Sequence, residues 1–343
     1  MDKRVIFAVA GSGKTTHIVE RLNLEERALI VTYTENNFAH LRSRVLQKFG
    51  YMPENIKIFT YFTFLHSFCF QPFLQMRLKT RGITFQQPPL STAKIALNNI
   101  NRYVDGNRRL YHNRLAKLLV EATCVPEINK RIETYFDYFF VDEVQDFGGH
   151  DFNFLLKIST AKVRVLFVGD FYQHTFDTSK DGNVNKNLHD NIGKYEKNFS
   201  DIGFVVDKST LISSRRCSSD VCDFIKSNLL IEMCSHTSRV SKVMIVEAEE
   251  QADALYQNNS IVKLFYESHY KYNCYSHNWG ASKGLDHYQD VCVVLNKGTW
   301  QKLKRGTLQE LAPMTRNKIY VACSRARGDL FLVPDIYFKK YLA

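Results

Sequence analysis

The sequence predicts an α/β protein of two lobes, each with a parallel sheet, and three observations lead to this fold class. Residues 4–8 form a short apolar run, followed by a glycine-rich turn and a helical segment at residues 15–24. Two more apolar runs, at residues 136–142 and 163–169, also end abruptly in polar turns. The chain has 343 residues, more than the roughly 250 to 300 that one core supports. We therefore expect lobes at residues 1–205 and 206–343.

The first turn has the composition of a phosphate-binding loop. Its glycines let backbone N–H groups approach a phosphate closely, and a lysine follows that can reach the β- and γ-phosphates. The next residue supplies a hydroxyl for a magnesium ion. Ala8 stands where such loops usually have their first glycine. The predicted nucleotide-binding residues are Ala10, Gly11, Ser12, Gly13, Lys14, Thr15 and Thr16.

The other two strand ends carry residues suited to phosphate chemistry. Asp142 ends one strand and is predicted to hold the metal with Thr15, while Glu143 is predicted to act as the base that orients water. The other strand leads through a Gly-Asp turn to Gln173, which could sense the γ-phosphate. A helix-like stretch at residues 317–327 places Arg325 ahead of a further strand, where an arginine could stabilise transferred charge.

Short boxes along the whole chain resemble those of the UvrD/Rep/PcrA-like superfamily 1 helicases. Residues 142–146 resemble the D-E-x-Q-D box and residues 169–173 the G-D-x-x-Q box. Residues 321–327 are similar to the V-x-x-T-R-A-R box. The remaining similar segments, in chain order, are residues 29–37, 41–44, 64–68, 211–216 and 282–286.

This resemblance implies two RecA-like P-loop NTPase lobes that clamp ATP and Mg²⁺ between them. It implies that Lys14, Glu143, Gln173, Arg216 and Arg325 are catalytic. It also implies that Gly284 and Asp286 contribute to the nucleotide site. The implied activity is ATP-driven movement along single-stranded DNA, in the 3′-to-5′ direction, with RNA as an alternative polynucleotide.

Basic residues are concentrated where the helicase family inserts its first accessory domain. Residues 77–117 contain nine basic residues and one acidic residue, against a net charge of +11 for the chain. Apolar periodicity predicts helices at residues 93–100 and 115–121. We expect a small helical insertion, at about residues 70–130, with a charged face for a polyanion.

Three features depart from the family pattern. Only 66 positions separate Arg216 from Ser282, room for a strand at residues 242–247 and a helix at residues 260–267, so the second accessory domain is expected to be missing. A counterpart of the family's adenine-reading segment ahead of the first strand is not expected, which leaves the choice of nucleotide base open. Thr178 replaces an expected tryptophan, and residues 177–187 are expected to be a surface loop.

Aromatic side chains are needed as platforms for single-stranded nucleic acid, because base stacking is tolerant of sequence. Four aromatic residues match positions that lie near the bound nucleic acid in the helicase family. A fifth aromatic residue has no counterpart in the family. The predicted set is Tyr33, Phe64, His66 and Phe176, with Trp279 as the extra.

The composition narrows the class of protein. No apolar run approaches the roughly 20 residues of a membrane span, no signal peptide is expected, and the eight cysteines form no C-x-x-C pair, so a cytoplasmic protein with reduced thiols is predicted. Two alternatives to a DNA translocase stay open. One is a regulatory ATPase subunit of a multi-subunit complex, such as a nuclease in phage defence, and the other is a compact RNA helicase.

Overall fold

The computed structural model describes residues 2–176 and 181–342, which form two compact units. Unit 1 comprises residues 2–6, 14–169 and 181–207 of the described chain. Unit 2 comprises residues 7–13, 170–176 and 208–342. The main division therefore follows Asp207, and two short segments from earlier in the chain pack within unit 2. These segments include most of the phosphate loop and the turn after the third apolar run.

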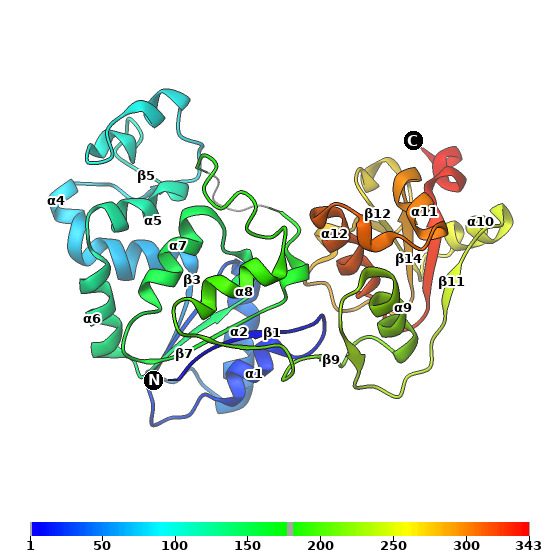
Figure 1. Cartoon of the computed structure of the whole chain (residues 1–343), viewed down its shortest axis with the longest axis horizontal. Coiled ribbons are helices and arrows are strands. Elements are labelled where there is room, and N and C mark those ends of the chain that lie inside the picture. Colours follow the sequence, from blue (N-terminus) through cyan, green and yellow to red (C-terminus); the bar gives the residue numbers. More distant parts are fainter. Residues whose placement is uncertain (1, 177–180, 343) are drawn as a thin grey trace. The chain divides into compact units, whose positions relative to one another are not determined.

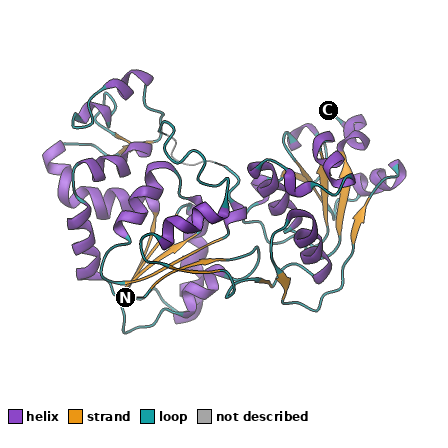
Figure 2. Ribbon diagram, in the orientation of Figure 1, coloured by secondary structure: helices purple, strands orange, loops and turns teal. Residues whose placement is uncertain are grey.

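Unit 1 is built on a six-stranded sheet, drawn in orange in Figure 2. The pairs β3–β2, β2–β6, β6–β7 and β1–β8 are parallel, and β2 is buried along its whole length, as is usual for an inner strand of a parallel sheet. In sheet order the strands are β3 (Ile56–Thr60), β2 (Ala28–Thr32), β6 (Tyr138–Asp142), β7 (Arg164–Gly169), β1 (Lys3–Phe7) and β8 (Val205–Asp207).

The register of this sheet sets where three turns that carry predicted site residues or their neighbours begin. Thr32 at the end of β2 is opposite both Thr60 at the end of β3 and Asp142 at the end of β6. Tyr33, Tyr61 and Glu143 therefore all follow the same edge of the sheet.

Helices connect the strands of unit 1 (Figure 1), and two of them, α2 and α8, begin at a residue whose side chain caps the helix. In α2, Thr34 accepts a hydrogen bond from the Asn37 N–H, and Gly50 ends the helix in the left-handed conformation. The helices are α1 (Lys14–Glu20), α2 (Glu35–Phe49), α3 (Tyr61–Thr63), α4 (Met76–Leu78), α5 (His112–Glu121), α6 (Val125–Tyr135), α7 (Gly149–Ile158) and α8 (Ile192–Ser200).

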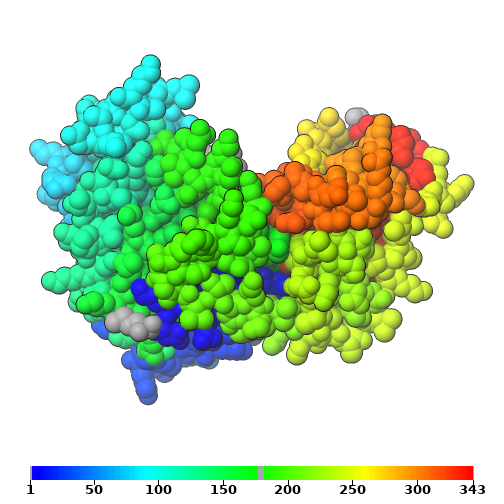
Figure 3. Space-filling model, viewed as in Figure 1, coloured from blue at the N-terminus to red at the C-terminus, as the bar shows by residue number. Residues whose placement is uncertain are grey.

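The insertion of unit 1 lies at its surface, in cyan in Figure 3. It begins with a π-helix, Phe64–Gln75, between α3 and α4. Two short parallel strands, β4 (Ile83–Thr84) and β5 (Leu110–Tyr111), then pair with each other. The helix predicted at residues 115–121 is confirmed as α5, but the one predicted at residues 93–100 is wrong. That segment forms only 3₁₀ turns, at Leu90–Lys94 and Ile100–Arg102, and most of its side chains are not buried.

Unit 2 contains a five-stranded sheet in which every pair of neighbours is parallel. In sheet order its strands are β11 (Val243–Ile245), β15 (Leu330–Pro334), β14 (Val291–Leu295), β12 (Val262–Phe265) and β13 (Ser276–Asn278). Its helices are α9 (Ser219–Leu229), α10 (Glu249–Gln257), α11 (Lys297–Lys304) and α12 (Pro313–Cys323). A separate short pair joins β9 (Ser213–Ser214) and β10 (Cys234–Ser235).

Two predictions for unit 2 have different outcomes. The strand at residues 242–247 is confirmed as β11, whereas the helix at residues 260–267 is wrong, because this segment is the buried inner strand β12. A short apolar run has no period that separates a buried strand from a buried helix. Among the residues described, no helix combines the length and apolar character needed to cross a membrane.

Candidate nucleotide-binding site

The phosphate loop joins β1 to α1, and two of its glycines have positive φ, +72° at Gly11 and +89° at Gly13. Glycine adopts this conformation without the strain that a Cβ would cause. Gly11 is also closely packed, since a Cβ there would lie 2.7 Å from Arg216 Cβ and 2.9 Å from Ser214 Oγ. The Arg215 N–H donates to the Gly11 carbonyl (2.9 Å). Within unit 2 the loop is therefore backed by the segment that carries Arg216.

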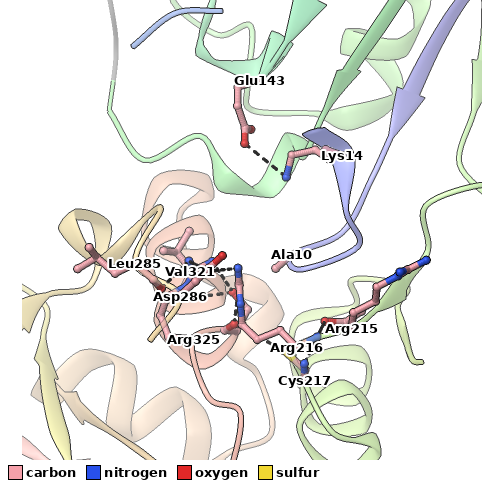
Figure 4. A network of polar contacts seen from close by, with 12 residues as sticks. Ala10, Lys14, Glu143, Arg215, Arg216, Cys217, Leu285, Asp286, Val321 and Arg325 are labelled. Atoms are coloured by element: carbon pink, nitrogen blue, oxygen red, sulfur yellow. Dashed lines mark hydrogen bonds and ion pairs between the residues drawn. The ribbon is translucent and has the colours of Figure 1, made fainter. Parts of the chain in front are cut away.

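Four side chains of unit 1 meet at the carboxyl end of β6. Thr15 Oγ1 donates to Asp142 Oδ2 (2.8 Å), and Lys14 Nζ lies 3.5 Å from Glu143 Oε1 (Figure 4). Asp142 is 1% exposed. Burial and then the Glu143 carboxylate raise the pKa of Asp142 to about 7, against the opposite effects of Lys14 and Thr15. The predicted metal, base and phosphate residues are thus neighbours.

Glu143 has a backbone conformation that is rare for a side-chain-bearing residue, with φ 58° and ψ 49°. Such a conformation is held in place by its surroundings and is often found at functional sites. Gln145 Nε2 donates to Glu143 Oε2, and a Cβ at Gly169 would collide with Gln145 Oε1. Gly169 thus leaves room for Gln145, which holds the side chain of the predicted base Glu143. The glutamine of the 142–146 box was not predicted as a site residue, although its position in that box was a signal.

A second set of contacts, all within unit 2, ties the phosphate loop to the residue after β7. The Ala10 N–H donates to Tyr320 Oη (2.8 Å), and Tyr320 Oη donates to Asp170 Oδ2 (2.8 Å). Tyr320 and Asp170 are both fully buried. Burial, followed by the Asp170 charge, raises the pKa of Tyr320 far above its usual value, so the phenol stays protonated and can donate. Gln173, at the end of the 3₁₀ turn Phe171–Gln173, is 5% exposed.

Arg216 and Arg325 share the carboxylate of Asp286 in unit 2, as Figure 4 shows. Arg216 also donates to the Ser324 carbonyl (3.1 Å). Arg325 is 1% exposed and donates to the carbonyls of Val321 (3.1 Å) and Leu285 (3.3 Å). Burial and then the Arg216 charge lower the pKa of Arg325 to about 10, so it remains charged at neutral pH.

Asp286 therefore holds the two arginines together in this structure. Gly284, two residues earlier, has φ +84° and nothing close to where a Cβ would stand. The predicted roles of these two residues in nucleotide binding stay predictions.

The residues present fit a magnesium–nucleotide group. Ser12 Oγ is buried and has no hydrogen-bond partner among the described residues, so the loop has an unused polar atom. Asp142 and Thr15 offer the hard oxygen ligands that Mg²⁺ prefers, and a divalent cation offsets the cost of burying a carboxylate. Thr16 lies in the first turn of α1, next to these groups in the chain.

The predicted base-stacking residues fall into two groups. Phe176 is 52% exposed, Tyr33 is partly exposed and stacks on Tyr61 (5.6 Å between ring centres), and His66 is half-buried. Phe64 and Trp279 are fully buried. Phe64 packs in the unit 1 core against Phe68 and Phe139, and Trp279 packs in the unit 2 core with its Nε1 donating to the Leu264 carbonyl.

Neither of these two buried rings has a face open to a base. Their assignment as stacking platforms disagrees with the structure and is not retained. Their burial reflects the strands that they cover, which sequence position alone does not reveal. Thr178 lies outside the described residues, as do residues 177–180 of the predicted loop.

The basic insertion uses several arginines internally. Arg102 donates to the Ala93 carbonyl (2.7 Å), and Arg108 donates to the Lys79 carbonyl (3.0 Å). Arg109 pairs with Asp105 (2.7 Å) and the buried Arg114 pairs with Asp181 (3.0 Å). Much of the charge expected to face a polyanion therefore stabilises the insertion itself. Exposed basic side chains remain at Arg77, Lys79, Arg81 and Lys94.

Comparison with known proteins agrees with this architecture. The chain shares its fold with the arterivirus nonstructural protein 10 (helicase) solved in complex with DNA, at 15% identity and a TM-score of 0.51, over 96% of this chain and 60% of that one. A second structure of an arterivirus nonstructural protein 10 (helicase) has 16% identity and a TM-score of 0.48, over 96% and 59% of the two chains. The chain thus spans about 60% of the length of these structures.

No curated protein matches the sequence. The family model AAA_19, described as an AAA domain, matches residues 2–177, which is more than half of the chain and includes the phosphate loop and the Asp142–Glu143 turn. This chain belongs to the AAA_19 family of AAA domains.

Proposed function

We propose that this chain is an ATP-dependent superfamily 1 translocase or helicase that acts on single-stranded DNA. The observation that carries the proposal is the cluster at the end of β6, where Lys14, Thr15, Asp142 and Glu143 lie beside the phosphate loop. Family membership supports nucleotide chemistry at this cluster. The 3′-to-5′ direction rests on the resemblance of the sequence boxes alone.

Each residue of the cluster has a part in hydrolysis. Bound Mg²⁺–ATP would supply the phosphoanhydride bond, and Thr15 and Asp142 would hold the metal. Lys14 and the N–H groups of Gly11 and Gly13 would bind the phosphates. Glu143 would orient the attacking water and accept its proton at Oε1 or Oε2, while Gln145 keeps the carboxylate in place.

The arginines supply positive charge for the transferred phosphoryl group. The Arg216 backbone packs against Gly11, within the same unit, which supports a role beside the phosphates. Arg325 is now bonded to carbonyls of its own unit, so a phosphate contact requires these bonds to be exchanged. Asp286, which pairs with both arginines, would then act as their alternative partner to phosphate.

Single-stranded DNA is proposed from three considerations. A structural neighbour with the same fold is described as a helicase in complex with DNA. Phe176 has an exposed ring on which a base could stack. It is the last residue of the segment 170–176, which is linked to the phosphate loop by the hydrogen bonds of Tyr320 with Ala10 and Asp170. The exposed lysines and arginines of the insertion offer phosphate contacts.

A second candidate is a regulatory ATPase subunit of a larger nucleic-acid complex, and a third is a compact RNA helicase. The regulatory role is favoured by the short segment between Arg216 and Ser282 and by the internal use of the insertion's arginines.

Steady-state ATPase rates with no nucleic acid, single-stranded DNA, single-stranded RNA and duplex DNA separate the three. Stimulation by single-stranded DNA above all others is expected, with Glu143→Gln as the inactive control. Stimulation by RNA alone would favour the third candidate, and hydrolysis that no polynucleotide changes would favour the second.

A further inference from the structure

One large aromatic ring of unit 1 is exposed without being isolated. Phe85, just after β4, is 64% exposed. Its ring stacks on His112 (5.1 Å between centres, 29° between planes) and meets the edge of Phe62 (5.4 Å, 89°). Phe62 and His112 also touch each other (5.5 Å, 78°). Three rings from different segments therefore support one open aromatic face.

The position of this cluster follows from the sheet. Phe62 lies two residues after the end of β3, and its ring contacts that of Tyr33, the residue after β2 (5.7 Å). Both strands end at the edge where β6 delivers Asp142. The cluster thus adjoins the predicted stacking residue Tyr33, on the same unit and the same sheet edge as Glu143.

The surroundings of the Phe85 ring suit a ligand that has flat rings and a negatively charged backbone. An aromatic ring exposed to this extent gains little free energy from the hydrophobic effect unless a ligand covers it. His112 Nδ1 lies 3.3 Å from the Thr84 carbonyl, which fixes its ring, and burial lowers the pKa of His112, so it presents a neutral π-face. Exposed Arg81 lies four positions before Phe85, with Arg77 and Lys79 just upstream in the chain.

We propose that Phe85, backed by His112 and Phe62, is a stacking platform for an unpaired base of a single-stranded nucleic acid. Bases have π-faces of the right size, stacking on aromatic rings is tolerant of sequence, and basic side chains nearby can follow the phosphates. The proposal deepens the function proposed above and rests on it. It gives the insertion a direct role in holding the strand that the motor moves.

The test compares Phe85→Ala with Phe85→Trp and with Leu90→Ala. Leu90 is 92% exposed in the same insertion and serves as the matched apolar control. Binding of a fluorescein-labelled oligothymidine, an oligouridine and a duplex is measured by anisotropy at two salt concentrations. Loss of one stacked base should weaken single-strand binding by about 5- to 140-fold in Phe85→Ala. Phe85→Trp and Leu90→Ala should bind like the wild type.

Salt separates stacking from charge. The factor lost in Phe85→Ala should be the same at both salt concentrations, because no phosphate contact is removed. A loss that shrinks as salt rises would mean that the variant disturbs the basic side chains, and would overturn the platform. If Phe85→Ala weakened duplex binding by the same factor as single-strand binding, the platform would also be overturned, since paired bases cannot stack on the ring.

A crosslink locates the contact directly. The wild-type protein, irradiated with an oligonucleotide carrying 5-iodouracil, should yield a crosslinked peptide that contains Phe85. A crosslink confined to other aromatic residues, with unchanged affinity of Phe85→Ala, would reject the platform while leaving the motor function standing. A wild-type protein that hydrolyses ATP but binds no single strand would instead reject the proposed function, and the platform with it.

Discussion

Replacing Tyr320 with phenylalanine removes one hydroxyl that makes two buried hydrogen bonds. The Ala10 N–H loses its acceptor and Asp170 loses a donor, each at 2.8 Å. The aromatic ring stays, so no large cavity forms. A buried donor left without a partner costs about 1–3 kcal/mol, and a hydrogen bond to a charged group contributes about 1.5–3 kcal/mol. Asp170 still accepts a hydrogen bond from the Tyr172 N–H (3.1 Å), so the total loss of stability is smaller than the sum of these two contributions.

We expect unit 2 to lose about 2–4 kcal/mol of stability in Tyr320→Phe. Both tryptophans of the chain, Trp279 and Trp300, belong to unit 2, so tryptophan fluorescence during urea unfolding follows this unit alone. With a slope of about 2 kcal/mol per molar urea, the midpoint should fall by about 1–2 M.

Tyr270→Phe is the matched control for this experiment. Tyr270 is 75% exposed, and loss of its hydroxyl should change stability by less than about 0.5 kcal/mol. A Tyr320→Phe midpoint equal to that of Tyr270→Phe would show that the bonds from Ala10 through Tyr320 to Asp170 contribute nothing, and would refute the reasoning.

The remaining predictions concern the nucleotide site and Phe176. Lys14→Ala should lose nucleotide affinity, whereas Glu143→Gln should still bind ATP and turn over at least ~100-fold more slowly; wild-type turnover in Glu143→Gln would mean that another group is the base. Arg216→Ala and Arg325→Ala should abolish hydrolysis with only a moderate change in ATP affinity, and near-normal turnover in either would remove that arginine from the mechanism. Phe176→Ala should weaken single-stranded DNA binding by about 1–3 kcal/mol and lose DNA-stimulated hydrolysis and streptavidin displacement; retained stimulation would make this ring a structural side chain.

The fold class followed from patterns that are local in the sequence. A strand, a glycine turn and a helix are contiguous in residues 3–20, so their hydrogen-bonding and conformational preferences are readable without the rest of the chain. The runs that became β6 and β7 were equally clear, because inner strands of parallel sheets are apolar throughout. Where a short apolar run had no period, as at residues 260–267, the assignment failed.

Burial decided which of the predicted stacking residues are exposed. Phe64 and Phe85 look alike in the sequence, but Phe64 packs over the strands of the core, while Phe85 is exposed just after a short strand of the insertion. Similarly, three arginines counted toward a basic face are bonded inside the insertion, and a fourth, Arg114, pairs with Asp181 outside it. Charge and aromatic content can be read from composition, whereas exposure depends on neighbours that are far away along the chain.

The sequence by itself thus determined the parallel-sheet architecture and the phosphate loop with its adjoining acidic turn. Only the tertiary structure brought Ala10 to Tyr320, 310 positions away, Arg216 to Gly11, and Phe85 to Phe62 and His112. The physical reason is the range of the interactions. Backbone preferences act between neighbours in the chain, while hydrogen bonds and ring packing between distant segments exist only after the sheets have formed and fixed which side chains face each other.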